Sequence, residues 1–223
     1  MNELNTIAKL SEKYSNKPIV RALCHLIPGW SSADTLLQQR ANEIKRERII
    51  AFFDAIASGE TELTNEIIET EDFLHCYYAT LHAAINSRRK EKIKVLAKLL
   101  ASSHKIVSED SIDGYEEILS ALENISYREF AVLQTLYNYE IKHPFEGNEN
   151  VLQNTMKYWD TFKTEIIKKY NIPENQFLSF IKKTERTGLY LQITGAYWGY
   201  KGDKGRTTSL WQKLVDYIKE NKN

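Results

Sequence analysis

Three residues, His75, Cys76 and His82, come closest in type and spacing to a metal site in this sequence. Imidazole and thiolate groups bind zinc, and residues seven positions apart lie on nearly the same face of a helix. The set has no fourth ligand, and Cys76 projects about 100° away from His75 around a helix axis. No CxxC or HExxH motif accompanies it. We therefore interpret the three as side chains of a helical bundle and expect no metal.

Other arrangements that support catalysis are not evident in the sequence. No serine lies in a glycine-flanked elbow, and neither cysteine has a base at a recognisable spacing. The glycines form neither a GxGxxG motif nor a P-loop, so no phosphate-binding loop is indicated. Neighbouring acidic residues such as Glu116 and Glu117 are typical of solvated helix ends. We expect a protein that is not an enzyme and that carries no cofactor.

A basic surface near the C-terminus is the best candidate for a binding function. Nine basic and four acidic residues fall between Gln176 and Asn223. The helix expected after Pro173 would carry a polar face, and a hairpin tip would add further cations, as binding to duplex DNA requires. The alternative is a solvated face that serves protein contacts or folding alone. The candidate nucleic-acid-binding residues are Lys182, Lys183, Arg186, Lys204 and Arg206.

The segment from Asp72 to Ser103 is expected to organise the N-terminal half. Apolar residues recur at a spacing of three to four on both sides of Arg88-Arg89-Lys90, which predicts two consecutive helices with an exposed basic junction. Ser87 is expected to cap the second helix. Preceding helices would cover the apolar faces of this pair. We predict an N-terminal helical bundle over residues 1–104.

Residues 104–114 lack periodicity, and we interpret them as a loop between two domains. After them, Ser126-x-x-Glu129 is a capping box that predicts a helix start, and apolar spacing predicts a helix over residues 151–170 with Met156 in the core. Residues 189–200 are rich in aromatic and β-branched types, which predicts a hairpin with its turn at Gly195 or over residues 201–205. A final helix would begin at Thr208. We predict a C-terminal module over residues 115–223.

Composition narrows the class of protein. The 223 residues include 30 basic and 30 acidic side chains, so any role in nucleic-acid binding must rest on a local surface. The two cysteines lie in apolar runs, as expected for buried thiols in a reducing cytoplasm. Polar residues interrupt the N-terminus, so we expect no signal peptide. Ile19–Trp30 contains Arg21 and is too short to cross a bilayer, and we do not favour a membrane contact there.

The order of elements after Ser126 resembles a winged-helix domain. A helix ending Thr187-Gly188-Leu189, a hairpin, and a helix opening Thr207-Thr208-x-Leu210 follow the pattern of such domains. Trp211 occupies a position where many of these domains carry glycine, so close packing there must differ. The resemblance implies a mainly α-helical fold with one β-hairpin. It allows either DNA binding or protein binding by the module.

A wider resemblance covers most of the chain. The pieces that carry it are Ile27-Pro28-Gly29, Arg46-Glu47-Arg48-Ile49, Glu91-Lys92-Ile93-Lys94 and Ile125–Leu133. They are similar to the abortive-infection alpha family and related uncharacterised helical proteins of bacteria, which implies a role in phage defence. The resemblance transfers no catalytic residues. We expect an interaction or sensor protein that binds a protein partner or itself, and the alternative is a winged-helix regulator that binds DNA.

Overall fold

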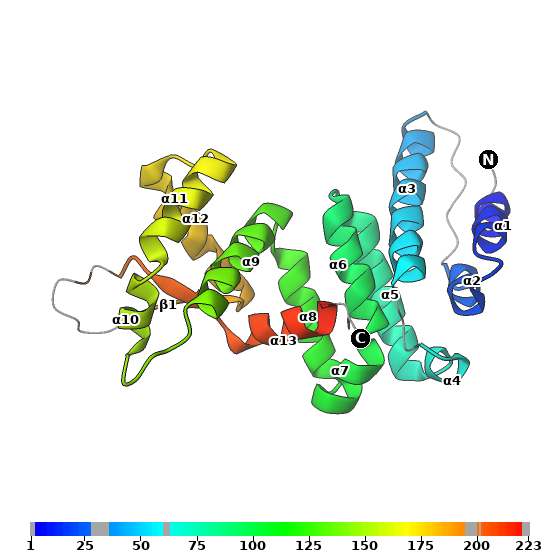
Figure 1. Cartoon of the computed structure of the whole chain (residues 1–223). Helices are drawn as coiled ribbons and strands as arrows, with labels where there is room; N and C mark the ends of the chain where they lie inside the picture. The colour runs from blue at the N-terminus through cyan, green and yellow to red at the C-terminus, as the bar shows by residue number, and fades with distance from the viewer. Residues whose placement is uncertain (1–2, 28–35, 60–62, 195–199, 201, 220–223) are drawn as a thin grey trace. The chain divides into compact units, whose positions relative to one another are not determined.

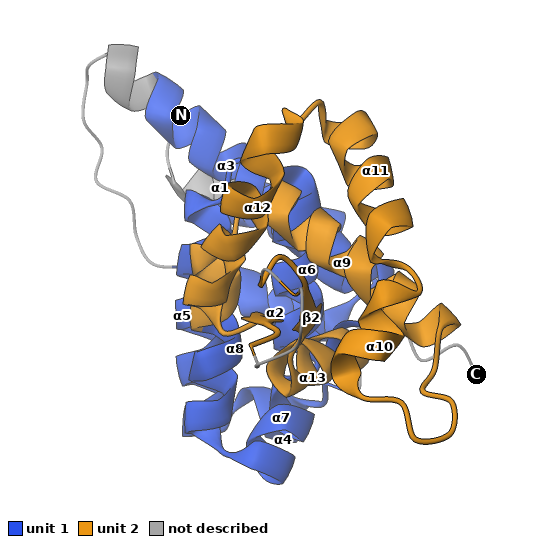
Figure 2. Cartoon of the chain, turned by 90° about the vertical axis from the view of Figure 1, so that its left-hand side faces the viewer, with its two compact units in different colours: residues 1–119, 217–223 blue, residues 120–216 orange. Residues whose placement is uncertain are grey.

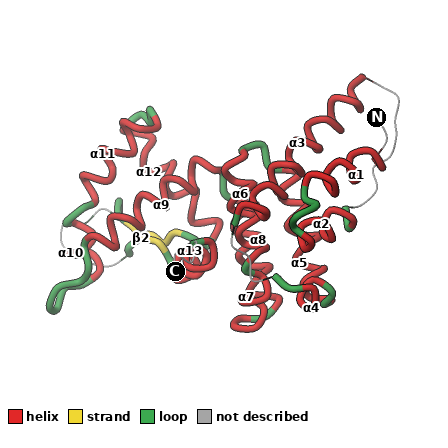
Figure 3. Tube along the Cα trace, turned by 45° about the vertical axis from the view of Figure 1, so that its right-hand side comes forward, coloured by secondary structure: helices red, strands yellow, loops and turns green. Residues whose placement is uncertain are grey.

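The computed structural model describes residues 3–27, 36–59, 63–194, 200 and 202–219, and it is mainly helical with one two-stranded antiparallel hairpin near the C-terminus (Figures 1 and 3). This confirms the predicted fold class. The first elements are α1 (Glu3–Lys13), α2 (Pro18–His25), α3 (Leu36–Ser58), α4 (Asn65–Ile68), α5 (Glu71–Asn86), α6 (Lys90–Ala101), α7 (Ser103–Asp110) and α8 (Ile112–Asn124). They are followed by α9 (Tyr127–Lys142), α10 (Val151–Met156), α11 (Trp159–Tyr170), α12 (Glu174–Lys182), the 3-10 helix η1 (Lys183–Thr187), β1 (Tyr190–Gln192), β2 (Gly205–Thr207) and α13 (Ser209–Ile218).

The chain divides into two compact units (Figure 2). Unit 1 comprises Met1–Leu119 together with Tyr217–Asn223, and unit 2 comprises Ser120–Asp216. The first boundary falls inside α8, after Leu119, and the second falls inside α13, so that the last turn of α13 from Tyr217 belongs to unit 1. Within unit 1, the Ser102 hydroxyl donates a hydrogen bond to the Tyr217 carbonyl at 2.7 Å, and the Tyr217 hydroxyl donates to Glu109 at 3.1 Å. These bonds attach the last helical turn to α6 and α7.

The core of unit 1 is built around α3, α5 and α6, which lie side by side in Figure 1. Phe73, Tyr77 and Leu81 of α5 are buried, as the apolar spacing predicts. The end of α5 differs from the prediction, because Ser87 does not cap α6. Its hydroxyl donates to the Ala83 carbonyl at 2.9 Å and so closes α5, whereas α6 begins after Arg89 with no side-chain cap.

The prediction of a loop over residues 104–114 is wrong. Helix α7 occupies residues 103–110, and α8 begins at Ile112. Only Ser111 separates the two helices, and its backbone has φ 94° and ψ 170°, a conformation that is strained for any residue with a side chain. The short hydrophobic run in α7, where Ile106 is buried, carries too few apolar positions to reveal a helix by periodicity.

Unit 2 confirms the predicted helix start at Ser126. The Ser126 hydroxyl accepts from the Glu129 amide at 3.2 Å, and the Glu129 carboxylate accepts from the Ser126 amide at 2.8 Å, which completes the capping box. The predicted helix over residues 151–170 is instead two helices, α10 and α11. The break changes the helical phase, so Tyr158 is buried while Met156 is 59% exposed, contrary to the prediction.

The hairpin pairs Tyr190 with Thr207 and Gln192 with Gly205. A turn at Gly195 is therefore wrong, because the connection runs from residue 193 to residue 204. Residues 195–199 of the predicted hairpin, and residue 201 of the connection, lie outside the described residues. Two amides at the outer edges of the sheet, those of Gln192 and Thr207, donate to the Glu185 and Glu140 carboxylates, each at 2.9 Å. Side chains thus occupy hydrogen-bonding positions on both edges.

Candidate nucleic-acid interface

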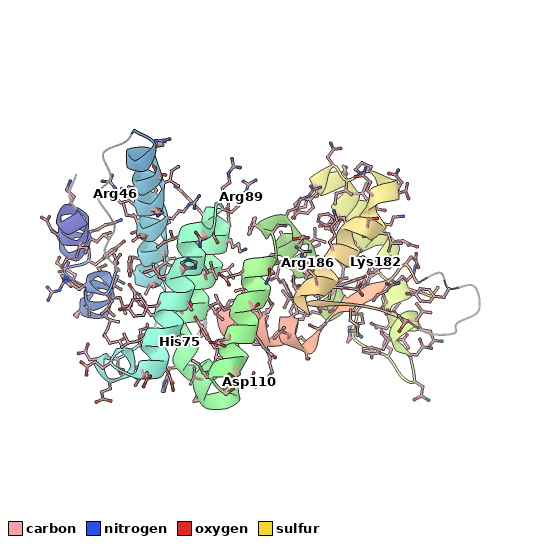
Figure 4. All side chains as sticks on the ribbon, turned by 180° about the vertical axis from the view of Figure 1, so that it is seen from behind. Arg46, His75, Arg89, Asp110, Lys182 and Arg186 are labelled. Atoms are coloured by element: carbon pink, nitrogen blue, oxygen red, sulfur yellow. The ribbon has the colours of Figure 1, made fainter. Side chains whose placement is uncertain are left out.

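Lys182 and Lys183 lie where α12 passes into η1 in unit 2 (Figure 4 labels Lys182). Phe177 and Ile181 anchor the buried face of α12, so the two lysines project on the opposite, exposed face. Neither ammonium group forms an ion pair with the described residues. Both are free to meet a phosphate group.

Arg186 follows them by one turn, but its guanidinium is engaged within unit 2. Its two Nη atoms donate to the Glu129 carboxylate at 3.0 and 3.1 Å, and Nη2 also donates to the Asn124 carbonyl at 2.9 Å. The Glu129 side chain is only 8% exposed. Burial raises the pKa of Glu129, but the hydrogen bonds from Arg186 and Ser126 outweigh that effect and leave this pKa below its usual value. Arg186 therefore joins η1 to the start of α9.

Arg206 pairs with a carboxylate near the C-terminal end of α9, as Arg186 does near its N-terminal end. Its Nε lies 3.8 Å from the Glu140 carboxylate, and its guanidinium lies 4.8 Å above the Phe145 ring. Glu140 also accepts hydrogen bonds from the amide and hydroxyl of Thr207. Burial raises the pKa of Glu140, although the Thr207 hydrogen bonds and the Arg206 charge oppose the rise. Arg206 and Thr207 therefore attach β2 to α9.

Lys204 precedes β2 in the hairpin connection. Its side chain is 14% exposed, and its ammonium group lies 3.2 Å from the Asp203 carboxylate. Its backbone is held by the Tyr200 hydroxyl, which accepts from the Lys204 amide at 3.1 Å. Lys204 is thus partly covered and paired with a neighbouring acid.

The five candidate residues are therefore not equivalent. Arg186 and Arg206 bind carboxylates eleven residues apart on α9, which corresponds to about 16 Å along the helix axis. The structure does not bring these two arginines together into one cationic surface. Lys182 and Lys183 are the members whose charge is uncompensated among the described residues.

The histidine and cysteine residues of α5, which are His75, Cys76 and His82, do not belong to a group of described residues that could hold a metal ion. His75 lies 2.7 Å from the Glu116 carboxylate of α8, and His82 is exposed beside Asn86 (Figure 4 labels His75). Burial raises the pKa of Cys76 to about 12, and the nearby Asp72 carboxylate adds to the rise. Within the described part of the chain, no three histidine, cysteine or acidic side chains are grouped so as to hold a metal ion.

Sequence reasoning missed a set of exposed apolar residues in unit 2. They lie in the last turn of α9, in the loop that follows, in α10 and in β1, and they are Ile141, Phe145, Val151, Met156 and Leu191. Their exposed fractions run from 42% for Val151 to 65% for Leu191. The strand position of Leu191 could have revealed it, because Tyr190 and Leu191 must point to opposite faces of a two-stranded sheet.

Comparison with known proteins gives no relative: no family model matches the chain, and no curated protein or solved structure does either. Among the described residues, no helix has the length and apolar character needed to cross a bilayer. We did not favour a membrane contact for the segment that ends at Trp30, and Trp30 itself lies outside the described residues.

Proposed function

We propose that this protein is a non-enzymatic interaction protein whose unit 2 binds a protein partner or a second copy through its exposed apolar residues. The observation that carries the proposal is their distribution. Of the described large apolar residues that are exposed, five belong to unit 2, and Ile44 and Tyr78 belong to unit 1. Apolar side chains gathered on a folded surface are typical of sites where another macromolecule excludes water.

Contacts within unit 2 support a continuous surface for at least part of this set. Leu191 is the cross-strand partner of Arg206, so the two side chains share one face of the hairpin. Arg206 in turn covers the Phe145 ring. Asn154 donates to the His143 and Pro144 carbonyls at 3.0 and 3.3 Å, which holds α10 beside the loop that carries Phe145. An arginine between two exposed apolar side chains is a common composition for the centre of a protein interface.

The defence-related setting of this proposal is supported by the resemblance to abortive-infection proteins in segments such as Ile125–Leu133, and a cytoplasmic setting is supported by the two cysteines in apolar runs. A role without catalysis is supported by the state of the thiols. Burial raises the pKa of Cys24 and of Cys76 to about 12, which keeps both in the unreactive thiol form.

Site-specific photo-crosslinking tests the proposed interface. A photoreactive phenylalanine analogue placed at Leu191 should give a discrete covalent adduct in cells that carry the native locus, or a crosslinked dimer of the purified protein. The same analogue at Tyr78, which is 44% exposed in unit 1, is the matched control and should give none. Equal labelling from both positions, or none from Leu191, would refute the assignment of this surface.

A second candidate function is a DNA-binding regulator that uses the winged-helix-like order of α12, the hairpin and α13. The observation that favours it is the free, exposed pair Lys182 and Lys183. Two phosphate contacts would supply a salt dependence with a slope of about −2 in a plot of log affinity against log salt. Reversing both charges should weaken duplex binding, and an unchanged affinity would remove α12 from the site.

A further inference from the structure

A second group of cations lies in unit 1, at the junction of α5 and α6 and on the neighbouring part of α3. We define the junction surface as Lys45, Arg48, Arg88, Arg89, Lys90 and Lys94. Arg48 is partly exposed, and the other five are exposed. These five form no ion pair with the described residues. The proposed protein interface of unit 2 does not use any of them.

One hydrogen bond joins the two halves of this surface. The Arg48 guanidinium of α3 donates to the Ile85 carbonyl, near the end of α5, at 2.5 Å. Arg88 follows Ile85 by three residues, so it lies within about 11 Å of that carbonyl along the chain. Lys45 precedes Arg48 by three positions and therefore neighbours it on α3. In Figure 4, Arg46 of α3 and Arg89 lie at a similar level along the bundle.

Among the described residues, no ion pair joins an acidic side chain of the same segments to the five exposed cations, and Glu43 instead pairs with Arg40 at 2.5 Å. Glu47 projects about 160° away from Lys45 around the axis of α3. Glu91 is exposed and forms no ion pair with the described residues. The cations also precede and begin α6, whose N-terminal end carries the positive pole of the helix dipole and lacks a side-chain cap. Cations at that end of a helix are unfavourable, and an external anion would offset this effect.

We propose that the junction surface binds the phosphate backbone of nucleic acid without sequence specificity. Nucleic-acid interfaces are strongly positive and need no apolar centre. A protein partner would ordinarily meet aromatic or apolar side chains at the centre of its interface, and insertion into a membrane would require an apolar face. Among the described residues of α3, α5 and α6, the exposed large apolar side chains are Ile44, at 37%, and Tyr78, at 44%, which precedes Arg88 by ten residues.

Fluorescence anisotropy with random-sequence duplex DNA and RNA, measured over a range of salt concentrations, tests this proposal. Three phosphate contacts from Arg88, Arg89 and Lys90 contribute about −2.7 to the slope of log affinity against log salt. The triple reversal R88E/R89E/K90E should reduce affinity at low salt by at least tenfold. It should also make the slope of log affinity against log salt shallower by about 2.7. The matched control K182E/K183E, in unit 2, should retain most of the affinity.

Three outcomes would overturn the proposal. The first is wild-type protein that binds neither nucleic acid at low salt. The second is an affinity that falls with K182E/K183E and not with the triple reversal, which would instead support the regulator hypothesis. The third is binding to anionic phospholipid vesicles that exceeds binding to nucleic acid. The neutral variant K90Q/K94Q is the control for misfolding. It should keep the wild-type melting temperature and show an intermediate loss of affinity.

Discussion

Replacing Arg186 by methionine should destabilise unit 2, because this residue holds a buried carboxylate. The guanidinium makes two hydrogen bonds to Glu129 and one to the Asn124 carbonyl. Methionine keeps much of the aliphatic contact but supplies no donor. Glu129 would then remain 8% exposed without its cation, although the Ser126 amide would still donate to it.

The magnitude follows from the exposure of the two partners. A hydrogen bond to a charged group contributes about 1.5–3 kcal/mol, and the contributions within one carboxylate are not additive. Solvent competes for Arg186, whose side chain is 47% exposed, and this lowers the value of the pair. Glu129 stays largely buried in the variant and cannot be fully hydrated, so the loss of its cation destabilises the fold more than it would at the surface. We expect a loss of about 2 kcal/mol in unfolding free energy, or roughly 4–8 °C in melting temperature for a chain of this size.

Denaturant unfolding of wild type and Arg186→Met at neutral and acidic pH checks the reasoning. The pKa of Glu129 lies below its usual value of 4.5 in the folded protein, so the stabilisation is fully present above that value and is lost as pH falls through the lowered pKa. The difference between the proteins should therefore shrink as the pH falls below 4.5 and through the lowered pKa of Glu129. Lys183→Met, at an exposed neighbour, should change stability by less than about 0.5 kcal/mol. Equal stability of the Arg186 and Lys183 variants at neutral pH would refute the argument.

Two further substitutions and one labelling experiment have definite expected outcomes. Ser111→Gly should stabilise the protein by about 1 kcal/mol in thermal unfolding, because glycine adopts φ 94° without a Cβ clash; a loss of stability would contradict the strain. Gly205→Ala should destabilise unit 2 by more than about 2 kcal/mol, since the new Cβ would lie 2.6 Å from the Leu191 carbonyl oxygen, and a neutral effect would show that the hairpin can shift. Cys24 and Cys76, with pKa values of about 12, should resist thiol reagents in native protein at pH 8 and react on unfolding, whereas rapid native labelling would exclude their burial.

Local signals in the sequence were sufficient where a few neighbouring residues decide the structure. The capping box of Ser126 and Glu129 predicted the start of α9, and periodicity predicted α5 and α6. Partners distant in the chain were not predictable in this way. Arg186 and Glu129 are 57 residues apart, and only the folded chain shows that an arginine on an apparently polar face is engaged with a buried acid. The exposure of Met156 likewise depends on the break between α10 and α11, which apolar spacing did not reveal.

The carboxylates of Glu185 and Glu140 at the edges of the hairpin have a consequence for how the protein meets other chains. A sheet of two strands has two open edges, and the unpaired backbone groups at each edge can pair with a further strand from a neighbouring molecule. Here a side-chain carboxyl group accepts a hydrogen bond from an outward amide on each side, and an incoming strand would have to displace it. At the high protein concentration of a cell, such hairpins should resist edge-to-edge assembly into extended sheets. A partner that recognises unit 2 must approach the face of the hairpin rather than its edge.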